Sequence, residues 1–189
     1  MINRNYNKQT TTEEIKISNY SYTFKILLLG DGAVGKTALV HRFVHNKFQK
    51  AYLMTIGMEP YSRYETIEGT KICYSLWDIA GQDRFKVMRG MFFRGAMGAL
   101  VVFDLTRRES FNNAQTWINE AKEESPDQIF ILVGNKNDLE DLREISTEEG
   151  TTKAKEMGAI DYIETSALTG TNVAESFKHI GKTLIDKRK

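Results

Sequence analysis

The chain has 189 residues, which is enough for one domain with a full core and too few for two ordinary domains. Hydrophobic residues make up 41% of it and charged residues 27%, as in soluble globular proteins, and a net charge of +1 gives no support to nucleic-acid binding. The roughly eighteen consecutive apolar residues of a membrane span are missing, as is the apolar core of a signal peptide. Since Cys73 is the only cysteine, we expect no disulfide framework and a cytoplasmic protein.

The domain organisation follows from where periodic patterns begin and end. Residues 1–22 are rich in Asn, Thr, Tyr and Lys and show no sustained periodicity, which predicts a flexible N-terminal leader. We therefore place one domain at residues 23–186 and a short basic tail at residues 187–189.

The first half of the domain contains one helix and three strands. An apolar run at residues 24–29 predicts a strand, and residues 38–43 behind it predict a helix. Strand-like segments at 58–67 and 71–79 are separated by a short turn at residues 68–70, which predicts a hairpin.

The second half alternates strands with helices. Its apolar runs are continuous, as in strands covered on both faces, and a capping box at residues 146–149 opens one of its helices. The pattern predicts an α/β fold with a six-stranded, mostly parallel sheet, one antiparallel hairpin at its edge, and about five helices on both faces. The expected elements are strands at 99–105, 129–134 and 160–165 and helices at 110–124, 146–157 and 173–184.

A phosphate-binding loop is predicted between the first strand and the first helix. The sequence Gly-Asp-Gly-Ala-Val-Gly-Lys-Thr at residues 30–37 fits the pattern G-x-x-x-x-G-K-[ST]. Such a loop aims backbone N–H groups inward, its glycines let phosphate oxygens approach, and the helix N-terminus adds positive partial charge. Lys36 is expected to reach the β- and γ-phosphates and the Thr37 hydroxyl to ligate Mg²⁺. The nucleotide-binding residues expected here are Gly32, Ala33, Val34, Gly35, Lys36, Thr37 and Ala38.

On this motif alone the protein can be an ATPase, a nucleotide kinase or a GTPase, so the base must be identified elsewhere. Asp138 follows a buried strand, at the sheet edge where ligands bind in open α/β folds. Its carboxylate can accept hydrogen bonds from N1–H and N2–H₂ of guanine, whereas adenine offers no such donor pair. The Lys136 stem can cover one face of the base, and the loop at 164–168 can offer a backbone N–H to guanine O6. The expected base-site residues are Asn135, Lys136, Asp138, Ser166, Ala167 and Leu168.

The segment Trp-Asp-Ile-Ala-Gly-Gln-Asp-Arg-Phe at residues 77–85 predicts the reaction chemistry. Asp78 ends a strand and can hold Mg²⁺ through a water, and Gly81 offers a backbone N–H where a γ-phosphate would lie. Gln82 can orient the attacking water, which makes it the expected catalytic residue. The Thr55 hydroxyl can complete the Mg²⁺ shell only while a γ-phosphate holds its loop closed, so this loop is expected to act as a switch.

Five ordered motifs of the chain resemble those of Ras-superfamily small GTPases, and most closely the Rab branch. They are GDGAVGKT, TIG, WDIAGQDRF, GNKNDL and ETSALTG, and the resemblance extends over about residues 24–184. It implies a small G-domain of the P-loop NTPase class, with Phe48 packed against the guanine and Tyr52 over the phosphates. It also implies that Trp77 and Phe92 occupy two positions of the aromatic triad that binds Rab effectors.

Three departures from the family pattern affect the expected partners. Pro60 stands at the third, usually aromatic, position of the triad, so we expect effectors other than the ordinary Rab ones. Leu168 replaces the lysine of the Ras and Rab branches, but the Rho branch also has leucine there, so guanine binding is expected to survive. The chain carries no C-terminal prenylation cysteines, so no lipid anchor is encoded in it. Membrane association is then expected only through a partner or through a tail absent from this chain.

The resemblance implies an enzyme that acts as a switch. It would bind GTP or GDP with Mg²⁺, hydrolyse GTP slowly, and change its affinity for a GAP, an exchange factor and effectors. These partners would contact the segments near Thr55 and Gln82 and the pair Trp77 and Phe92. Slow turnover is expected because no arginine is obviously placed to act in cis.

Two other functions remain open from the sequence. One is a nucleotide-gated binding module or scaffold with negligible turnover, against which the presence of Gln82 argues. The other is a P-loop nucleotide kinase, which the aspartate at 138 disfavours because it selects guanine.

Overall fold

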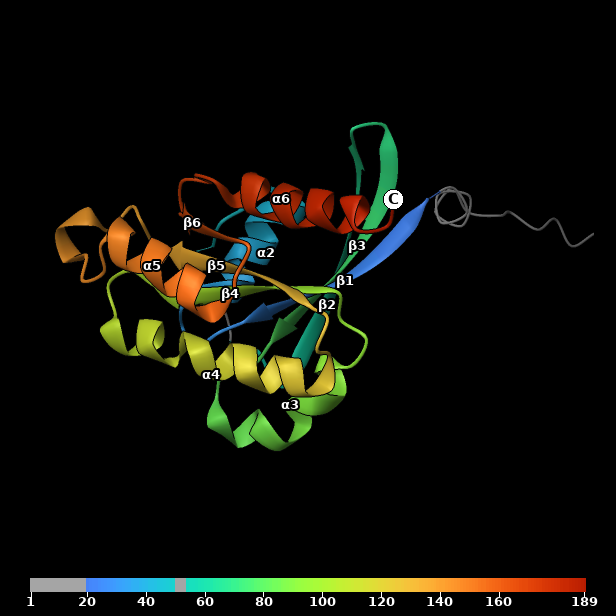
Figure 1. The fold of residues 1–189 in the computed structure, drawn as a ribbon. Helices are drawn as coiled ribbons and strands as arrows, with labels where there is room; N and C mark the ends of the chain where they lie inside the picture. Colours follow the sequence, from blue (N-terminus) through green and yellow to red (C-terminus); the bar gives the residue numbers. More distant parts are fainter. Residues whose placement is uncertain (1–19, 50–53) are drawn as a thin grey trace, which may run out of the picture.

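The chain forms a six-stranded sheet between two layers of helices in a computed structural model that describes residues 20–49 and 54–189 (Figure 1). The strand order is β2-β3-β1-β4-β5-β6, and among these strands only β2 and β3 pair antiparallel. The predicted six-stranded, mostly parallel sheet with an antiparallel hairpin at its edge is therefore confirmed. The strands are β1 (Tyr22–Leu29), β2 (Met58–Ile67), β3 (Thr70–Ile79), β4 (Gly98–Asp104), β5 (Ile129–Asn135) and β6 (Asp161–Thr165).

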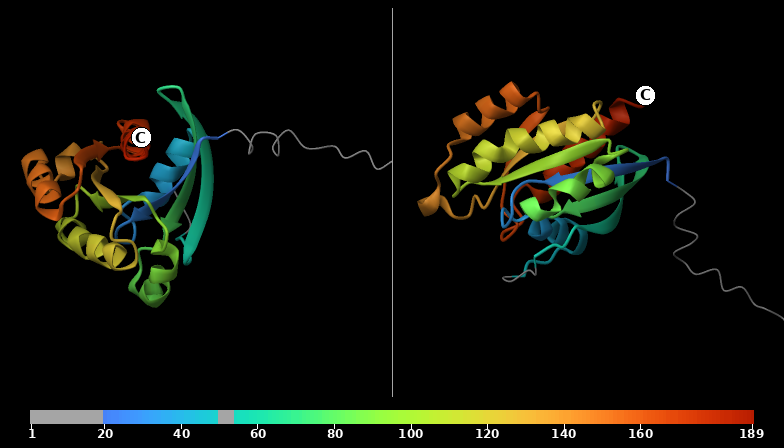
Figure 2. Two further views of the ribbon diagram at one scale, coloured as in Figure 1. Left: turned by 45° about the vertical axis from the view of Figure 1, so that its right-hand side comes forward. Right: turned by 90° about the horizontal axis from the view of Figure 1, so that it is seen from below.

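The described residues form five α-helices, as predicted, and two short 3-10 turns at Asp83–Phe85 and Glu140–Leu142. α2 and α6 cover one face of the sheet, and α3, α4 and α5 cover the other (Figures 1 and 2). Within the described ranges, none of the helices combines the length and the apolar character that crossing a bilayer requires. The helices are α2 (Lys36–His45), α3 (Lys86–Phe93), α4 (Arg108–Glu124), α5 (Thr147–Met157) and α6 (Val173–Asp186).

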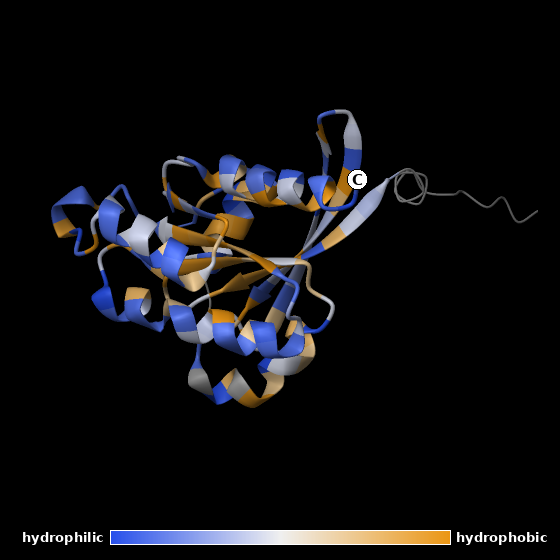
Figure 3. Cartoon of the chain, viewed as in Figure 1, coloured by the Kyte–Doolittle hydropathy of each residue, from blue (hydrophilic) through white to orange (hydrophobic). Residues whose placement is uncertain are grey.

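The core lies in two layers, one on each face of the sheet. Every residue of β4 and β5 is buried, because helices cover both faces of these parallel strands. The strands accordingly carry the apolar residues and the outer helix faces the polar ones (Figure 3). Under α2 and α6, the rings of Phe43 and Phe177 stack with centroids 4.0 Å apart. On the other face, Phe103 and Phe111 meet edge to face at 5.0 Å.

Most element boundaries differ from the predicted ones by one or two residues. β1 begins at Tyr22, since this side chain packs on the core and its ring stacks on Phe24 with centroids 5.6 Å apart. Tyr22 thus belongs to β1, and residues 1–19 of the predicted leader lie outside the described residues. The predicted capping box is present: Ser146 Oγ accepts from Glu149 N at 3.2 Å, and Glu149 Oε2 accepts from Ser146 N at 2.9 Å.

α3 is the helix that the sequence pattern does not reveal. Its apolar side chains Val87, Met88 and Met91 are exposed, whereas Arg89 is buried. A helical period is recognised over a window of about 11–18 residues, and α3 has only eight, so its pattern is too short to indicate a helix. Apolar exposure of this kind beside a pocket is typical of an interaction surface.

The topology brings five loops to one edge of the sheet. β1, β3, β4, β5 and β6 run parallel, so their carboxyl ends meet there. Ligands bind at this edge in open α/β sheets. Most predicted site residues lie at the ends of β1, β3, β5 and β6, whereas Phe48 and Thr55 lie in the segment between α2 and β2.

Candidate functional site

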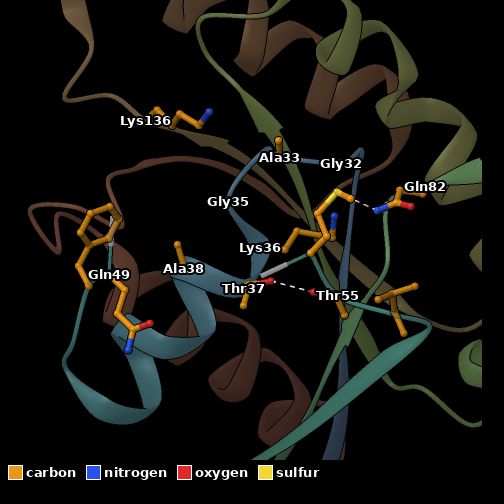
Figure 4. Close-up of a pocket in the computed structure, with 14 residues that line it drawn as sticks. Gly32, Ala33, Gly35, Lys36, Thr37, Ala38, Gln49, Thr55, Gln82 and Lys136 are labelled. Carbon is orange, nitrogen blue, oxygen red and sulfur yellow. Dashed lines mark hydrogen bonds between the residues drawn. The ribbon is translucent and has the colours of Figure 1, made fainter. Parts of the chain in front are cut away.

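A cavity of about 330 Å³ lies at this edge of the sheet (Figure 4). Gln49, Met54 and Ile79 also line it and were not predicted. Val34, Asp78, Asn135, Asp138, Ser166, Ala167 and Leu168 do not line it, and Tyr52 lies outside the described residues. The predicted residues that line the cavity are Gly32, Ala33, Gly35, Lys36, Thr37, Ala38, Phe48, Thr55, Gly81, Gln82 and Lys136.

Backbone conformations that glycine favours shape the loop at residues 30–37. Gly30 and Gly35 have φ angles of 133° and 100°, in the left-handed region. A Cβ on Gly30 would lie 2.0 Å from the Val102 carbonyl oxygen, and one on Gly35 would lie 2.3 Å from the Asn135 side-chain nitrogen. The loop therefore turns back tightly against β4 and β5, and larger residues at these two positions would open it.

Lys36 begins α2 and carries a buried ammonium group. Its Nζ donates to the carbonyl oxygens of Gly30 at 2.7 Å and Asp31 at 2.8 Å. Burial lowers the pKa of Lys36 to about 8, although the Asp78 and Asp31 carboxylates oppose this. A buried cation held mainly by carbonyl groups is stabilised when an anion enters the adjoining cavity.

The three residues predicted to hold a metal converge on one carboxylate. Asp78 Oδ2 accepts from Thr37 Oγ1 at 2.6 Å and from Thr55 Oγ1 at 2.9 Å, and the two hydroxyl oxygens are 3.0 Å apart. Asp78 Oδ1 is buried and has no hydrogen-bond partner among the described residues. Burial raises the pKa of Asp78, while the hydrogen bonds from the two hydroxyls oppose the rise.

This oxygen cluster fits a hard divalent cation. Mg²⁺ prefers oxygen ligands and is typically held by one or two protein carboxylates together with substrate phosphates. In the described ranges no three His, Cys, Asp or Glu side chains gather to form a metal site of their own. One carboxylate and two hydroxyls therefore suit a cation that takes its remaining ligands from water and a phosphate ligand.

Gly81 and Gln82 follow β3 and lie against the loop at residues 30–37. A Cβ on Gly81 would lie 2.3 Å from the Asp31 carbonyl carbon and 2.4 Å from the Gly32 nitrogen, so only glycine allows this approach. The Gln82 amide borders the cavity and donates to the Met54 sulfur at 3.0 Å (Figure 4). Gln82 is thus next to both the loop and the segment that leads to Thr55.

Asn135 joins loops and does not face the cavity. Its Nδ2 donates to the Val34 carbonyl oxygen at 2.9 Å. Its Oδ1 accepts from Thr165 Oγ1 at 3.1 Å and from Ala167 N at 3.3 Å. This buried amide therefore ties the loop after β1 to the loop after β6.

Asp138 and Lys136 lie on the same side of the site as the loop after β6. Ser166 Oγ donates to Asp138 Oδ1, which fixes the carboxylate against that loop. Lys136, in the left-handed region at φ 70°, forms an ion pair with Asp104. Burial would raise the pKa of Asp104, but hydrogen bonds from Lys136 and Thr106 hold it below its usual value.

Two arginines contact the site and were not predicted. Arg42 of α2 donates from Nε to the Ala167 carbonyl at 2.9 Å and from Nη2 to the Leu168 carbonyl at 2.7 Å. Arg107, just before α4, donates from Nη2 to the Gly32 carbonyl at 2.8 Å. An arginine therefore does lie on the loop at residues 30–37, which the sequence did not suggest. Nothing in the sequence marks either arginine for these contacts, because their partners are more than seventy residues away in the chain.

The three residues of the expected effector triad lie close together. Trp77 of β3 pairs in register with Pro60 of β2, and its ring centroid is 6.3 Å from that of Phe92. Ile56 and Met91 are exposed nearby in sequence. The triad positions and these apolar side chains belong to the segments that flank the cavity.

The chain was compared with models of known protein families. Residues 25–186 match the model described as the Ras family. The matched range contains every described helix and all of the sheet except the first residues of β1.

Proposed function

The chain belongs to the Ras family of small GTPases, and we propose that it is a Rab-like switch that binds GTP or GDP with Mg²⁺ and hydrolyses GTP slowly. The family membership supports guanine-nucleotide binding in general. The Rab-like role in trafficking or signalling, the Mg²⁺ ion and the roles of individual residues are the proposal.

One observation carries the proposal: the hydroxyls of Thr37 and Thr55 meet on one oxygen of Asp78, and its other oxygen is buried with no hydrogen-bond partner in the described part of the chain. These side chains come from three separate segments of the chain. Mg²⁺ bound there would neutralise charge that develops on the β- and γ-phosphate oxygens.

The chain's own residues supply positioning and electrostatics. Lys36 would exchange its carbonyl partners for phosphate oxygens, and backbone N–H groups of residues 32–37 would hold the same phosphates. Gln82 would hold the attacking water in line with the γ-phosphate through its side-chain amide. Gly81 would donate its backbone N–H to the γ-phosphate, from its place against the loop.

Guanine would be selected on the side of the site that holds Asp138. The carboxylate, fixed by Ser166, would accept from N1–H and N2–H₂ of the base. The Lys136 stem and the Phe48 ring would lie on the two faces of the base, and Tyr52 would lie over the phosphates. The Ala167 N–H donates to Asn135 Oδ1 in this structure and would donate to guanine O6 when the nucleotide is bound, with Leu168 beside it.

The switch would depend on Thr55. Its hydroxyl lies on Asp78 in this structure, and a γ-phosphate would keep it there through the bound cation. Loss of that phosphate would release the segment and change the surface near Trp77 and Phe92. A GAP, an exchange factor and effectors would bind the two forms of this surface with different affinities. We place the protein in the cytoplasm.

Single-turnover hydrolysis of preloaded GTP tests the enzymatic part. We expect slow hydrolysis by the parent and at least about a tenfold lower rate for Gln82→Leu, since the variant cannot orient water. Gln115→Leu is a matched control, because Gln115 pairs with Asn119 on α4 away from the cavity. A parent that holds guanine nucleotide but consumes no GTP over hours would support the alternative, a nucleotide-gated binding module or scaffold.

A further inference from the structure

Helix α4 holds the loop at residues 30–37 through the side chain of Asp31. Trp117 Nε1 donates to Asp31 Oδ1 at 2.8 Å, and Asn113 Nδ2 donates to Asp31 Oδ2 at 2.8 Å. Trp117 is buried, so its indole N–H depends on this partner. Both carboxylate oxygens of the residue just before Gly32 are therefore fixed to one helix.

The face of the same tryptophan carries Arg89 of α3. The Arg89 guanidinium carbon lies 4.0 Å from the centre of the Trp117 ring. Its Nη2 donates to the Gln82 carbonyl oxygen at 2.9 Å, and its Nη1 pairs with Glu120 Oε2 at 3.3 Å. Arg89 is 3% exposed, so these contacts are shielded from water.

Trp117 thus stands between the two parts that the proposed reaction must bring together. Its N–H holds the loop through Asp31, and its ring supports the arginine that holds the backbone of Gln82. We propose that Arg89 and Trp117 are positioning residues for GTP hydrolysis, which fix Gln82 relative to the phosphate-binding loop. This inference rests on the proposed function, because it assigns a role within that reaction.

The physical reason is the accuracy that water positioning requires. Displacement of a reacting group by about 1 Å can lower a rate about 100-fold. The Gln82 side chain has only a flexible methionine as a hydrogen-bond partner among the described residues, so its position depends on its backbone. That backbone is fixed on one side by the contact of Gly81 with the loop and on the other by Arg89.

An arginine is required here because one group makes several different contacts. The planar guanidinium stacks on the indole, donates to a carbonyl and pairs with a carboxylate at the same time. A lysine would keep the charge but offers one nitrogen on a flexible stem. Arg89→Lys should therefore lose most of the positioning.

Arg94 provides a matched control on the same pair of helices. It follows α3 directly and pairs with Glu124 of α4 at 3.4 Å, but its side chain is 78% exposed. It contacts neither Gln82 nor Trp117. Its removal breaks an ion pair between α3 and α4 but leaves the contacts of Arg89 and Trp117 intact.

The test is single-turnover hydrolysis of preloaded GTP, together with the rate of GDP dissociation. We expect Arg89→Ala and Arg89→Lys to lower the hydrolysis rate about tenfold and to change GDP dissociation less than threefold. Arg94→Ala should change neither rate more than twofold. In hydrogen exchange, the peptide with residues 81–85 should exchange faster in Arg89→Ala than in the parent or in Arg94→Ala.

Trp117→Phe tests whether the two contacts act together, since it keeps a ring under Arg89 but removes the N–H to Asp31. We expect about a threefold lower hydrolysis rate. In the Arg89→Ala background this change should add no further loss. If the double variant instead showed the product of the two separate losses in rate, Arg89 and Trp117 would act independently, and the proposal that they act together would be wrong.

Two failures are distinguishable. A parent that hydrolyses GTP while Arg89→Ala keeps its rate and its exchange behaviour would overturn the positioning role alone. A parent that consumes no GTP would overturn the proposed enzymatic function and this inference with it.

Discussion

The two ends of the site differ in how their parts are held. At the phosphate end, predicted residues contact one another directly: Thr37 and Thr55 meet on Asp78, and Lys36 closes its own loop. At the base end, Phe48 and Lys136 line the cavity, whereas the other predicted residues lie outside it and are held by side chains from other elements. Asn135 and Arg42 both hold the loop that contains Ala167.

The phosphate end combines a local unit, in which Lys36 bonds to its own loop, with long-range contacts at Asp78. The base end lacks such a local unit and is joined by side-chain contacts between separate loops. A strand-loop-helix unit makes most of the phosphate end within a few residues. The base end needs two loops that are some thirty residues apart in the chain, so it needs side chains that join them. Substitutions at either end should therefore have separable effects on nucleotide binding.

Lys36→Ala should break the phosphate end. The ammonium is buried beside the cavity, and loss of a buried charge-assisted contact costs about 2–5 kcal/mol, so GDP affinity should fall by about 100-fold or more. Titration with fluorescent GDP measures this. Lys155→Ala on the exposed face of α5 is the control, and equal affinities of the two variants would contradict the assignment.

Asp138→Asn should alter the base end without touching the phosphate end. The amide can no longer accept from both guanine donors, so GDP affinity should fall by about 100-fold. Xanthosine diphosphate, whose base has a carbonyl in place of the amino group, should bind the variant better than the parent. Competition between the two diphosphates gives the result, and unchanged preference for guanine would exclude contact with Asp138.

A change of pH should weaken the phosphate end alone. The pKa of Lys36 is lowered to about 8 without ligand, and a bound phosphate would raise it again. Binding then takes up a proton above pH 8, so GDP affinity should fall about tenfold between pH 7 and pH 9. Affinity measured across this range in the parent and in Asp138→Asn should show the same slope, and a flat profile would contradict the assigned pKa.

The same shift affects the stability of the nucleotide-free protein in the opposite direction. Between about pH 8 and 10.5 the unfolded chain binds more protons at Lys36 than the folded one. This group therefore adds stability as pH rises through that window.

Arg42→Ala should weaken nucleotide retention at the base end, because Arg42 holds the loop that contains Ala167 and Leu168. The loop would lose two donors to the Ala167 and Leu168 carbonyls, so GDP should dissociate about tenfold faster while bound GTP is hydrolysed at the parent's rate. Stopped-flow release of fluorescent GDP and single-turnover hydrolysis separate the two effects. Arg188→Ala, which has no contact with this loop, is the control; equal release rates would show that Arg42 plays no such part.

The fold was predictable where burial follows a regular pattern. The continuous apolar runs of β4 and β5 and the capping box at Ser146 indicated their elements because the signals are local. α3 was not predicted because its eight residues are too few to establish a helical period. That its methionines are exposed and Arg89 is buried follows only from the packing.

The site divides in the same way. Lys36, Thr37 and Gln82 follow from short motifs, and they do line the cavity. Arg42, Arg107 and Trp117 act through partners distant in the chain, and nothing within a motif marks an arginine or tryptophan for such a contact. Only the packing of α2 and α4 against the loops reveals them.

The identity of the nucleotide held by the purified protein tests the central claim most directly. The protein is purified with Mg²⁺, unfolded in acid, and the released nucleotide is separated and identified. The account predicts GDP or GTP at about one molecule per chain. Release of an adenine nucleotide, or no guanine nucleotide even after incubation with excess GDP and Mg²⁺, would contradict it.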